Sequence, residues 1–151
     1  MRRIKKDIED LQKNNFEIMC ENGEEINFES FCVLLQGPKD TAYENGQWRI
    51  RFTLANTYPF SSPSVGFVDK ILHPNIDWTS GSVCLDALNK KWSPVFSLRH
   101  IMEALLPYLL SNPNPDDPLN REAASQLVEN KKAYTLKVFD ATKRYSYKTK
   151  Q

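Results

Sequence analysis

The chain of 151 residues lacks several features that mark whole classes of protein. It has no run of about 18 apolar residues, so no transmembrane helix is indicated and we expect no membrane association. Its basic start, MRRIKKDIED, is not followed by an apolar segment, which argues against a secretory signal peptide. The phosphate-binding pattern G-x-x-x-x-G-K-[ST] is also missing, so we expect the chain to bind no ATP and no other cofactor.

Cysteine and histidine are scarce. The three cysteines are Cys20, Cys32 and Cys84, with no C-x-x-C pair, and the sequence holds only two histidines. Neither the count nor the spacing suits a zinc site or a disulfide framework, so we expect no metal and reduced thiols. Reduced thiols are typical of the cytoplasm and the nucleus. One of the three cysteines is therefore available as a nucleophile.

Charge of one sign does not dominate. The net charge is +1, made of +2 in residues 1–15, −7 in residues 16–130 and +6 in residues 131–151. Nucleic-acid-binding proteins usually carry a clear basic excess, so we expect no nucleic-acid partner. Basic ends are more often solvated helix faces or docking surfaces for acidic proteins. The length suits one domain, which we place at 1–146 with a short basic tail at 147–151, and we expect a monomer.

The periodicity of apolar residues predicts an α+β fold. Ile4, Ile8 and Leu11 form one stripe of a helix over 2–13. Four runs then read as strands at 16–20, 26–35, 48–54 and 64–68, with a hairpin turn at 21–24. Strict alternation in the third run indicates a half-buried strand of an antiparallel meander.

Residues 69–96 show no period, and a loop of this length in a small domain is usually functional. A central buried helix is predicted at 98–110, capped by Ser97 and kinked or ended by Pro107. Two further helices follow at 118–128 and 131–145, the first with Asp117 as its N-cap and Pro118 as its first residue.

Five motifs occur in a characteristic order. They are YPF-x-x-P at 58–63, HPN at 73–75, Cys84 followed by Leu85, Trp92, and P-x-D-P-L at 115–119. With these motifs the chain resembles the ubiquitin-conjugating enzyme (E2) family over about residues 1–145. The stretch 77–82, one residue longer than in the commonest members, and the segment YLLSNPNPDDPLNREAA resemble the H-type branch of the family.

The resemblance implies the ubiquitin-conjugating (UBC) fold and its activity. Such an enzyme accepts ubiquitin from an activating enzyme (E1) as a thioester on Cys84 and passes it to lysine amines of protein substrates with a ligase (E3), which we expect to be of RING type. The E1 uses the ATP. A catalytically silent E2-like ubiquitin-binding module is the alternative from another class, although such modules typically lack the cysteine. An E2 for another ubiquitin-like modifier is also open.

The resemblance also implies roles for single residues. No His or Lys adjoins Cys84 to depress the thiol pKa, unlike a protease pair that must attack an unactivated amide. Asn75 either donates a hydrogen bond to the oxyanion or orders the loop that frames Cys84. Asp117 orients the incoming lysine, with helix capping as the alternative, and Asp86 is a weaker candidate. His73 and Pro74 are expected to support the active-site loop.

Partner surfaces follow from the same resemblance. We expect E1 and E3 to dock on the first helix and on two loops, and we expect Phe60 to be an exposed anchor rather than a core aromatic. Cys20 and Cys32, which fall in predicted strands, are expected in the core. The docking residues are Arg2, Arg3, Lys5, Lys6, Phe60, Ser93 and Pro94.

Overall fold

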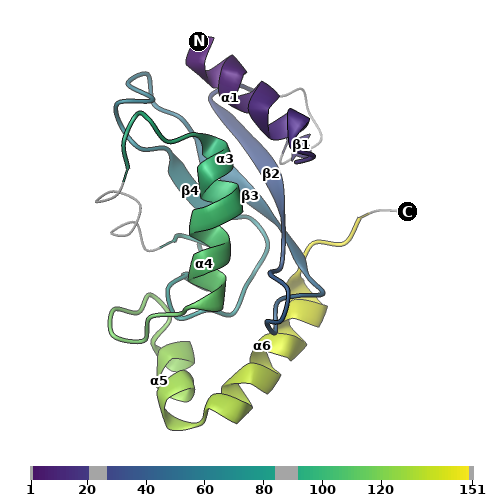
Figure 1. Cartoon of the computed structure of the whole chain (residues 1–151). Coiled ribbons are helices and arrows are strands. Elements are labelled where there is room, and N and C mark those ends of the chain that lie inside the picture. The colour runs from purple at the N-terminus through teal and green to yellow at the C-terminus, as the bar shows by residue number, and fades with distance from the viewer. Residues whose placement is uncertain (1, 21–26, 84–91, 150–151) are drawn as a thin grey trace.

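A computed structural model describes residues 2–20, 27–83 and 92–149. Helix α1 (Arg2–Lys13) lies over one end of a four-stranded sheet, and a long helix packs across one face of that sheet (Figure 1). The long helix comprises α3 (Leu98–His100), a π-helical turn η1 (Ile101–Leu105) and α4 (Leu106–Ser111). Helices α5 (Arg121–Glu129) and α6 (Lys131–Tyr145) occupy the opposite end. The α+β prediction and its order of elements are confirmed.

The sheet is an antiparallel meander in the order β1-β2-β3-β4. Its strands are β1 (Ile18–Met19), β2 (Ser30–Gln36), β3 (Gln47–Thr53) and β4 (Ser64–Phe67). Strand β3 buries every second side chain, Trp48, Ile50 and Phe52, as its alternation predicts. The predicted turn at 21–24 lies outside the described residues. Cys32 is buried in β2, whereas Cys20 follows β1 and is only half-buried, so its predicted place in a strand is wrong.

Strand β2 begins later than the apolar run predicts, at Ser30 rather than at 26. The reason is local. The Asn27 side-chain oxygen accepts a hydrogen bond from the Glu29 amide at 2.9 Å, and the Asn27 carbonyl accepts one from the Ser30 amide at 3.0 Å. These bonds close a tight turn, so the described residues before Ser30 do not extend the strand.

The central helix continues through Pro107 to Ser111, so Pro107 does not end it. The π-helical turn ends at Leu105, two residues before the proline, and the Leu106 amide donates to the Ile101 carbonyl five residues back. A wider turn at this point accommodates a residue that has no amide to donate and whose ring crowds the preceding carbonyls. The predicted cap is confirmed, since Ser97 Oγ accepts from the His100 amide at 3.3 Å.

The predicted start of helix α5 is wrong. It begins at Arg121 with Asn120 as its N-cap, and Asn120 Oδ1 accepts from the Ala123 amide at 3.1 Å. The amides of Leu119 and Asn120 instead donate to the Pro74 carbonyl at 2.8 and 2.9 Å. This contact keeps the chain before Asn120 out of the helix, so Asp117 is not a cap.

Residues 147–149, which belong to the expected tail, make contacts with strand β3. The Tyr147 amide donates to the Gln47 carbonyl at 2.8 Å, and the Gln47 side chain donates to Thr149 Oγ1 at 3.1 Å. The Arg49 guanidinium lies 4.8 Å from the centre of the Tyr147 ring. The described end of the chain therefore packs along β3.

Candidate active site

His73 anchors the HPN segment to the central helix. Its ring is fully buried, Nδ1 accepts a hydrogen bond from the Asn75 amide at 3.0 Å, and Nε2 lies 2.8 Å from the Leu109 carbonyl oxygen. Since Nδ1 accepts, Nε2 carries the proton and donates to that carbonyl. Burial lowers the pKa of His73 to about 4, against the opposing effect of the Leu109 bond, so the ring is neutral near pH 7. This geometry suits a side chain that holds the HPN segment against the central helix.

Asn75 points its side chain into the loop that precedes α5. The side-chain nitrogen donates to the carbonyls of Asn114 at 2.8 Å and Asp117 at 3.3 Å. The side-chain oxygen accepts from the Asn114 amide at 2.8 Å. Only 2% of the residue is exposed. Both amide hydrogens of Asn75 are therefore donated to backbone carbonyls, and the side chain fixes the turn at 114–117.

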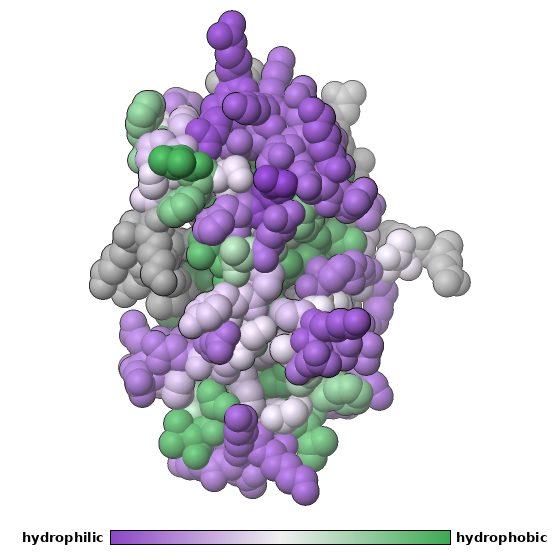
Figure 2. All heavy atoms as spheres, viewed as in Figure 1, coloured by the Kyte–Doolittle hydropathy of each residue, from purple (hydrophilic) through white to green (hydrophobic). Residues whose placement is uncertain are grey.

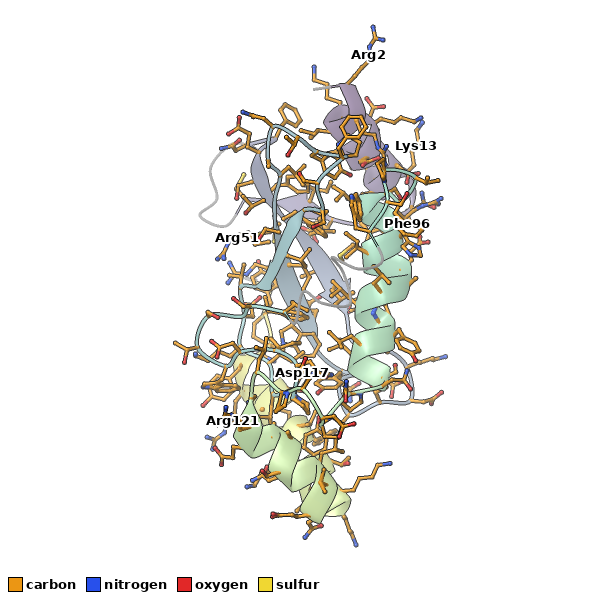
Figure 3. All side chains as sticks on the ribbon, turned by 90° about the vertical axis from the view of Figure 1, so that its left-hand side faces the viewer. Arg2, Lys13, Arg51, Phe96, Asp117 and Arg121 are labelled. Carbon is orange, nitrogen blue, oxygen red and sulfur yellow. The ribbon has the colours of Figure 1, made fainter. Side chains whose placement is uncertain are left out.

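Pro74 ties the same loop from its other end, because its carbonyl accepts the amides of Leu119 and Asn120. Asp117 lies exposed between these two attachments, in the loop before Arg121, as Figure 3 shows. The three residues of the HPN segment thus build one frame, which joins the central helix to the turn that carries Asp117. A carboxylate on such a turn is held in place at its backbone while its side chain reaches solvent.

The chain that leads to Cys84 is pinned beside this frame. Ile76, which directly follows Asn75, forms an isolated antiparallel bridge with Val83. Gly81 docks the intervening loop on β4 by accepting the Phe67 amide at 2.8 Å. Its φ is +76°, and a Cβ there would lie 1.9 Å from the Phe67 carbonyl oxygen, so only glycine fits. Cys84 and Asp86 themselves lie outside the described residues.

Comparisons with known proteins agree on one family. A family model described as ubiquitin-conjugating enzyme matches residues 3–142. The chain is 45% identical over 149 residues to ubiquitin-conjugating enzyme E2-24 kDa of Saccharomyces cerevisiae, which covers 99% of this chain and 67% of that protein. The chain belongs to the ubiquitin-conjugating enzyme (E2) family.

Further relatives of this E2 support the same assignment. It is 53% identical over 116 residues to ubiquitin-conjugating enzyme E2-23 kDa of Triticum aestivum, covering 77% of this chain and 63% of that protein. The E2 domain of a Toxoplasma gondii ubiquitin conjugating enzyme has a TM-score of 0.87 at 28% identity, covering 97% of this chain and 98% of that chain. The predicted UBC fold is confirmed.

The chain spans about two thirds of the length of the yeast and wheat relatives, 67% and 63%. In residues 2–20, 27–83 and 92–149, no helix has the length and apolar content needed to cross a bilayer.

The expected partner-facing loops of this E2 lie side by side. Trp92 Nε1 donates to the Pro59 carbonyl at 2.8 Å, and the Trp92 and Tyr58 rings lie 5.9 Å apart. Phe60 is 81% exposed and Val95 87% exposed, so the core alternative for Phe60 is wrong. Hydrophilic side chains of α1 adjoin hydrophobic ones on these loops in Figure 2. We call this surface the docking face and define it by half-buried Ser93 and the exposed residues Arg2, Lys5, Lys6, Phe60, Pro94 and Val95.

Arg3 differs from the other basic residues of α1. Its guanidinium donates to the carbonyls of Pro94, at 2.7 Å, and Phe96, and it pairs with Asp7 at 3.1 Å. Arg2, Lys5 and Lys6 are exposed. The Arg3 side chain is therefore occupied by contacts within the chain, which the helical spacing alone did not indicate.

Three residues that help to hold this region in place were not predicted from the sequence. Asn114 meets Asn75 only through the fold, 39 positions away. Gly81 is needed for a close approach to β4, and Asn120 caps α5 three residues later than the Asp-Pro pair suggested. The contacts of Asn114 and Gly81 are tertiary, whereas the Asn120 cap is a local pattern, because asparagine is a preferred N-cap and here accepts from the amide three residues on.

Proposed function

We propose that this E2 accepts ubiquitin from an E1 as a thioester on Cys84 and transfers it to lysine amines of protein substrates together with an E3. The bridge between Ile76 and Val83 is the observation that supports this most directly, because it fixes the residue before Cys84 beside the HPN segment. In the first step the Cys84 thiolate attacks the E1 thioester, a new thioester forms, and the E1 thiolate leaves. This exchange is close to thermoneutral and needs an accessible thiol rather than a strong base.

In the second step a lysine amine attacks the thioester, an oxyanion forms, and the Cys84 thiolate leaves. We propose that Asn75 serves this step mainly as a positioning residue, since both of its amide hydrogens are donated to the turn at 114–117. Asp117, exposed on that turn, orients the lysine and eases loss of its proton. Asp86 remains the weaker candidate for the same task, and His73 and Pro74 hold the loop.

The proposed partners of this E2 use the docking face. Exposed Phe60 is a suitable anchor for a RING-type ligase, and the cations of α1 suit an acidic surface on E1. The longer stretch at 77–82 supports assignment to the H-type branch. We place the reaction in the cytoplasm and/or the nucleus, where the nucleophile stays reduced.

The test is thioester formation. The protein is incubated with E1, ATP and ubiquitin, and the products are separated with and without reductant. We expect an adduct that reductant removes, that is absent in Cys84→Ala, and that persists in the matched variants Cys20→Ala and Cys32→Ala. An adduct that survives in Cys84→Ala and vanishes in Cys32→Ala contradicts the assignment of the nucleophile.

The same assay separates the two alternatives. A silent ubiquitin-binding module forms no adduct with any modifier. An E2 for another ubiquitin-like protein forms one only when ubiquitin and its E1 are replaced by that modifier and its own activating enzyme.

A further inference from the structure

A buried carboxylate lies beneath the docking face. Asp7 is 3% exposed although it belongs to the mostly solvated helix α1. A buried carboxylate is costly unless it is paired and hydrogen-bonded. Here the Arg3 Nε atom lies 3.1 and 3.2 Å from its two oxygens, and the Tyr58 hydroxyl donates to Oδ2. The apolar stripe of α1 does not call for a carboxylate at this position, so its placement needs another explanation.

Tyr58 belongs to the first of the two loops that carry the docking face. It is 8% exposed, and its ring lies 5.9 Å from that of Trp92 in the second loop, in a tilted arrangement. Burial, and after it the bond to Asp7, raise the pKa of Tyr58 far above its ordinary value, so the hydroxyl stays protonated and donates. Phe60, two residues later, is the most exposed aromatic side chain among the described residues.

Arg3 reaches the second loop. Its two terminal nitrogens donate to the carbonyls of Pro94 and Phe96, on either side of exposed Val95. Asp7 offsets the Arg3 charge, so the cations that the first two turns of α1 offer to a partner are Arg2, Lys5 and Lys6. In Figure 3 Arg2 projects away from α1, whereas Phe96 lies where α1 meets the central helix.

We propose that Arg3, Asp7 and Tyr58 are positioning residues that lock the loops bearing Phe60 and Val95 onto α1, so that a ligase meets a preformed docking face. The proposal rests on the proposed function, because it concerns the ligase-dependent step. It reassigns Arg3 from a residue that touches the partner to one that shapes the partner's binding site. Loops held in the bound arrangement lower the ordering entropy lost on binding, and this raises affinity without adding a contact.

Two substitutions separate shaping from direct contact. Tyr58→Phe removes one buried hydroxyl that a ligase does not reach. Arg3→Lys keeps the charge but replaces a planar fork of five donors by a single ammonium, which does not bridge Pro94, Phe96 and Asp7 at once. If Arg3 contacts the ligase only through its charge, Arg3→Lys keeps ligase binding. If Arg3 holds the loops in place, Arg3→Lys weakens ligase binding.

The chain offers a matched control. Arg99 pairs with Asp10 at 3.1 Å and also joins α1 to the central helix, but this pair makes no bond to the carbonyls at 94 and 96 among the described contacts. Asp10→Asn therefore loosens α1 without releasing the loops.

The experiment measures discharge of ubiquitin to lysine against ligase concentration, after loading with excess E1. We expect Tyr58→Phe and Arg3→Lys to raise the ligase concentration for half-maximal stimulation at least fivefold, while the rate at saturating ligase stays within twofold of wild type. This split is the signature of weakened binding with intact chemistry. Asp10→Asn should change the half-maximal concentration less than twofold.

A second readout needs no activity. The Phe96 amide donates to the Ser93 carbonyl at 2.9 Å, and its hydrogen exchange should be at least fivefold faster in Tyr58→Phe and Arg3→Lys than in Asp10→Asn. The proposal is overturned if both variants keep the wild-type exchange rate and the wild-type half-maximal ligase concentration. It is also overturned if Arg3→Lys keeps the wild-type half-maximal ligase concentration while Arg3→Ala raises it. A wild-type protein that forms no thioester refutes the proposed function instead, and the exchange comparison then still decides whether the loops are locked.

Discussion

Asn75→Ala tests how the HPN segment contributes to transfer. The substitution removes three hydrogen bonds, two donated to the carbonyls of Asn114 and Asp117 and one accepted from the Asn114 amide. Such bonds contribute about 0.5–1.5 kcal/mol each to stability. We therefore expect Asn75→Ala to lower the free energy of unfolding by about 2–4 kcal/mol. For a domain of this size the melting temperature should fall by roughly 5–15 °C.

Transfer should fail while loading survives. Loading requires Cys84 in a formed loop, whereas discharge also requires the turn at 114–117 that presents Asp117. The assay is single-turnover discharge to free lysine, measured well below the melting temperature of the variant. Amide hydrogen exchange at Asn114 is followed in parallel. We expect slower discharge together with faster exchange at Asn114, and no recovery of discharge as pH rises, because hydroxide does not rebuild the turn.

The positioning role and the oxyanion role predict different combinations. A side chain that only donates to the oxyanion affects the rate by about 10²–10³-fold and leaves the turn intact. An Asn75→Ala variant with wild-type melting temperature and wild-type exchange at Asn114 would refute the positioning role. A strong discharge defect in that variant would then assign Asn75 to the oxyanion.

Three further predictions concern single residues. Phe60→Ala should load normally and keep its melting temperature because the ring is exposed, but it should weaken ligase stimulation by about 2 kcal/mol; unfolding at room temperature would contradict this. Asp117→Ala should slow discharge, and the defect should shrink as the pH rises, because more of the lysine is then neutral amine. Its free energy of unfolding should change by less than about 0.5 kcal/mol because Asn120 is the cap. A wild-type discharge rate at every pH would remove Asp117 from the site. Because burial lowers the pKa of His73 to about 4, the unfolded chain binds a proton below about pH 6.5 that the folded chain does not. The free energy of unfolding should thus be highest above pH 6.5 and fall by up to about 3 kcal/mol towards pH 4. The measurement is denaturant titration of wild type and His73→Gln, and an equal dependence of the unfolding free energy on pH in the two proteins would contradict this.

The elements predicted best are those whose signal lies within a few residues. Helix α6 begins and ends where its periodicity places it, at Lys131 and Tyr145. The alternation of Trp48, Ile50 and Phe52 marks the buried face of β3 correctly. Periodicity works here because neighbouring side chains of one element share a face, so burial repeats along the chain.

The boundaries and the site depended on contacts between distant residues. The Asp-Pro pair at 117–118 has the composition of a helix start, yet α5 begins at Arg121 because the Pro74 carbonyl accepts the amides at 119 and 120. From the sequence, Asn75 is either an oxyanion donor or a residue that orders the loop. The structure adds its hydrogen bonds to the carbonyls of Asn114 and Asp117, which favour the second role.

The sequence by itself determined the family and the fold class, because the order and spacing of short motifs and the local periods are properties of the chain alone. Only the tertiary structure decided which residues act on one another. Arg3 looks like its exposed neighbours Arg2 and Lys5, and it becomes a brace because folding brings the Pro94 carbonyl, 91 positions away, within 2.7 Å of its guanidinium. A hydrogen bond depends on distance and direction in space, and a pattern along the chain carries neither.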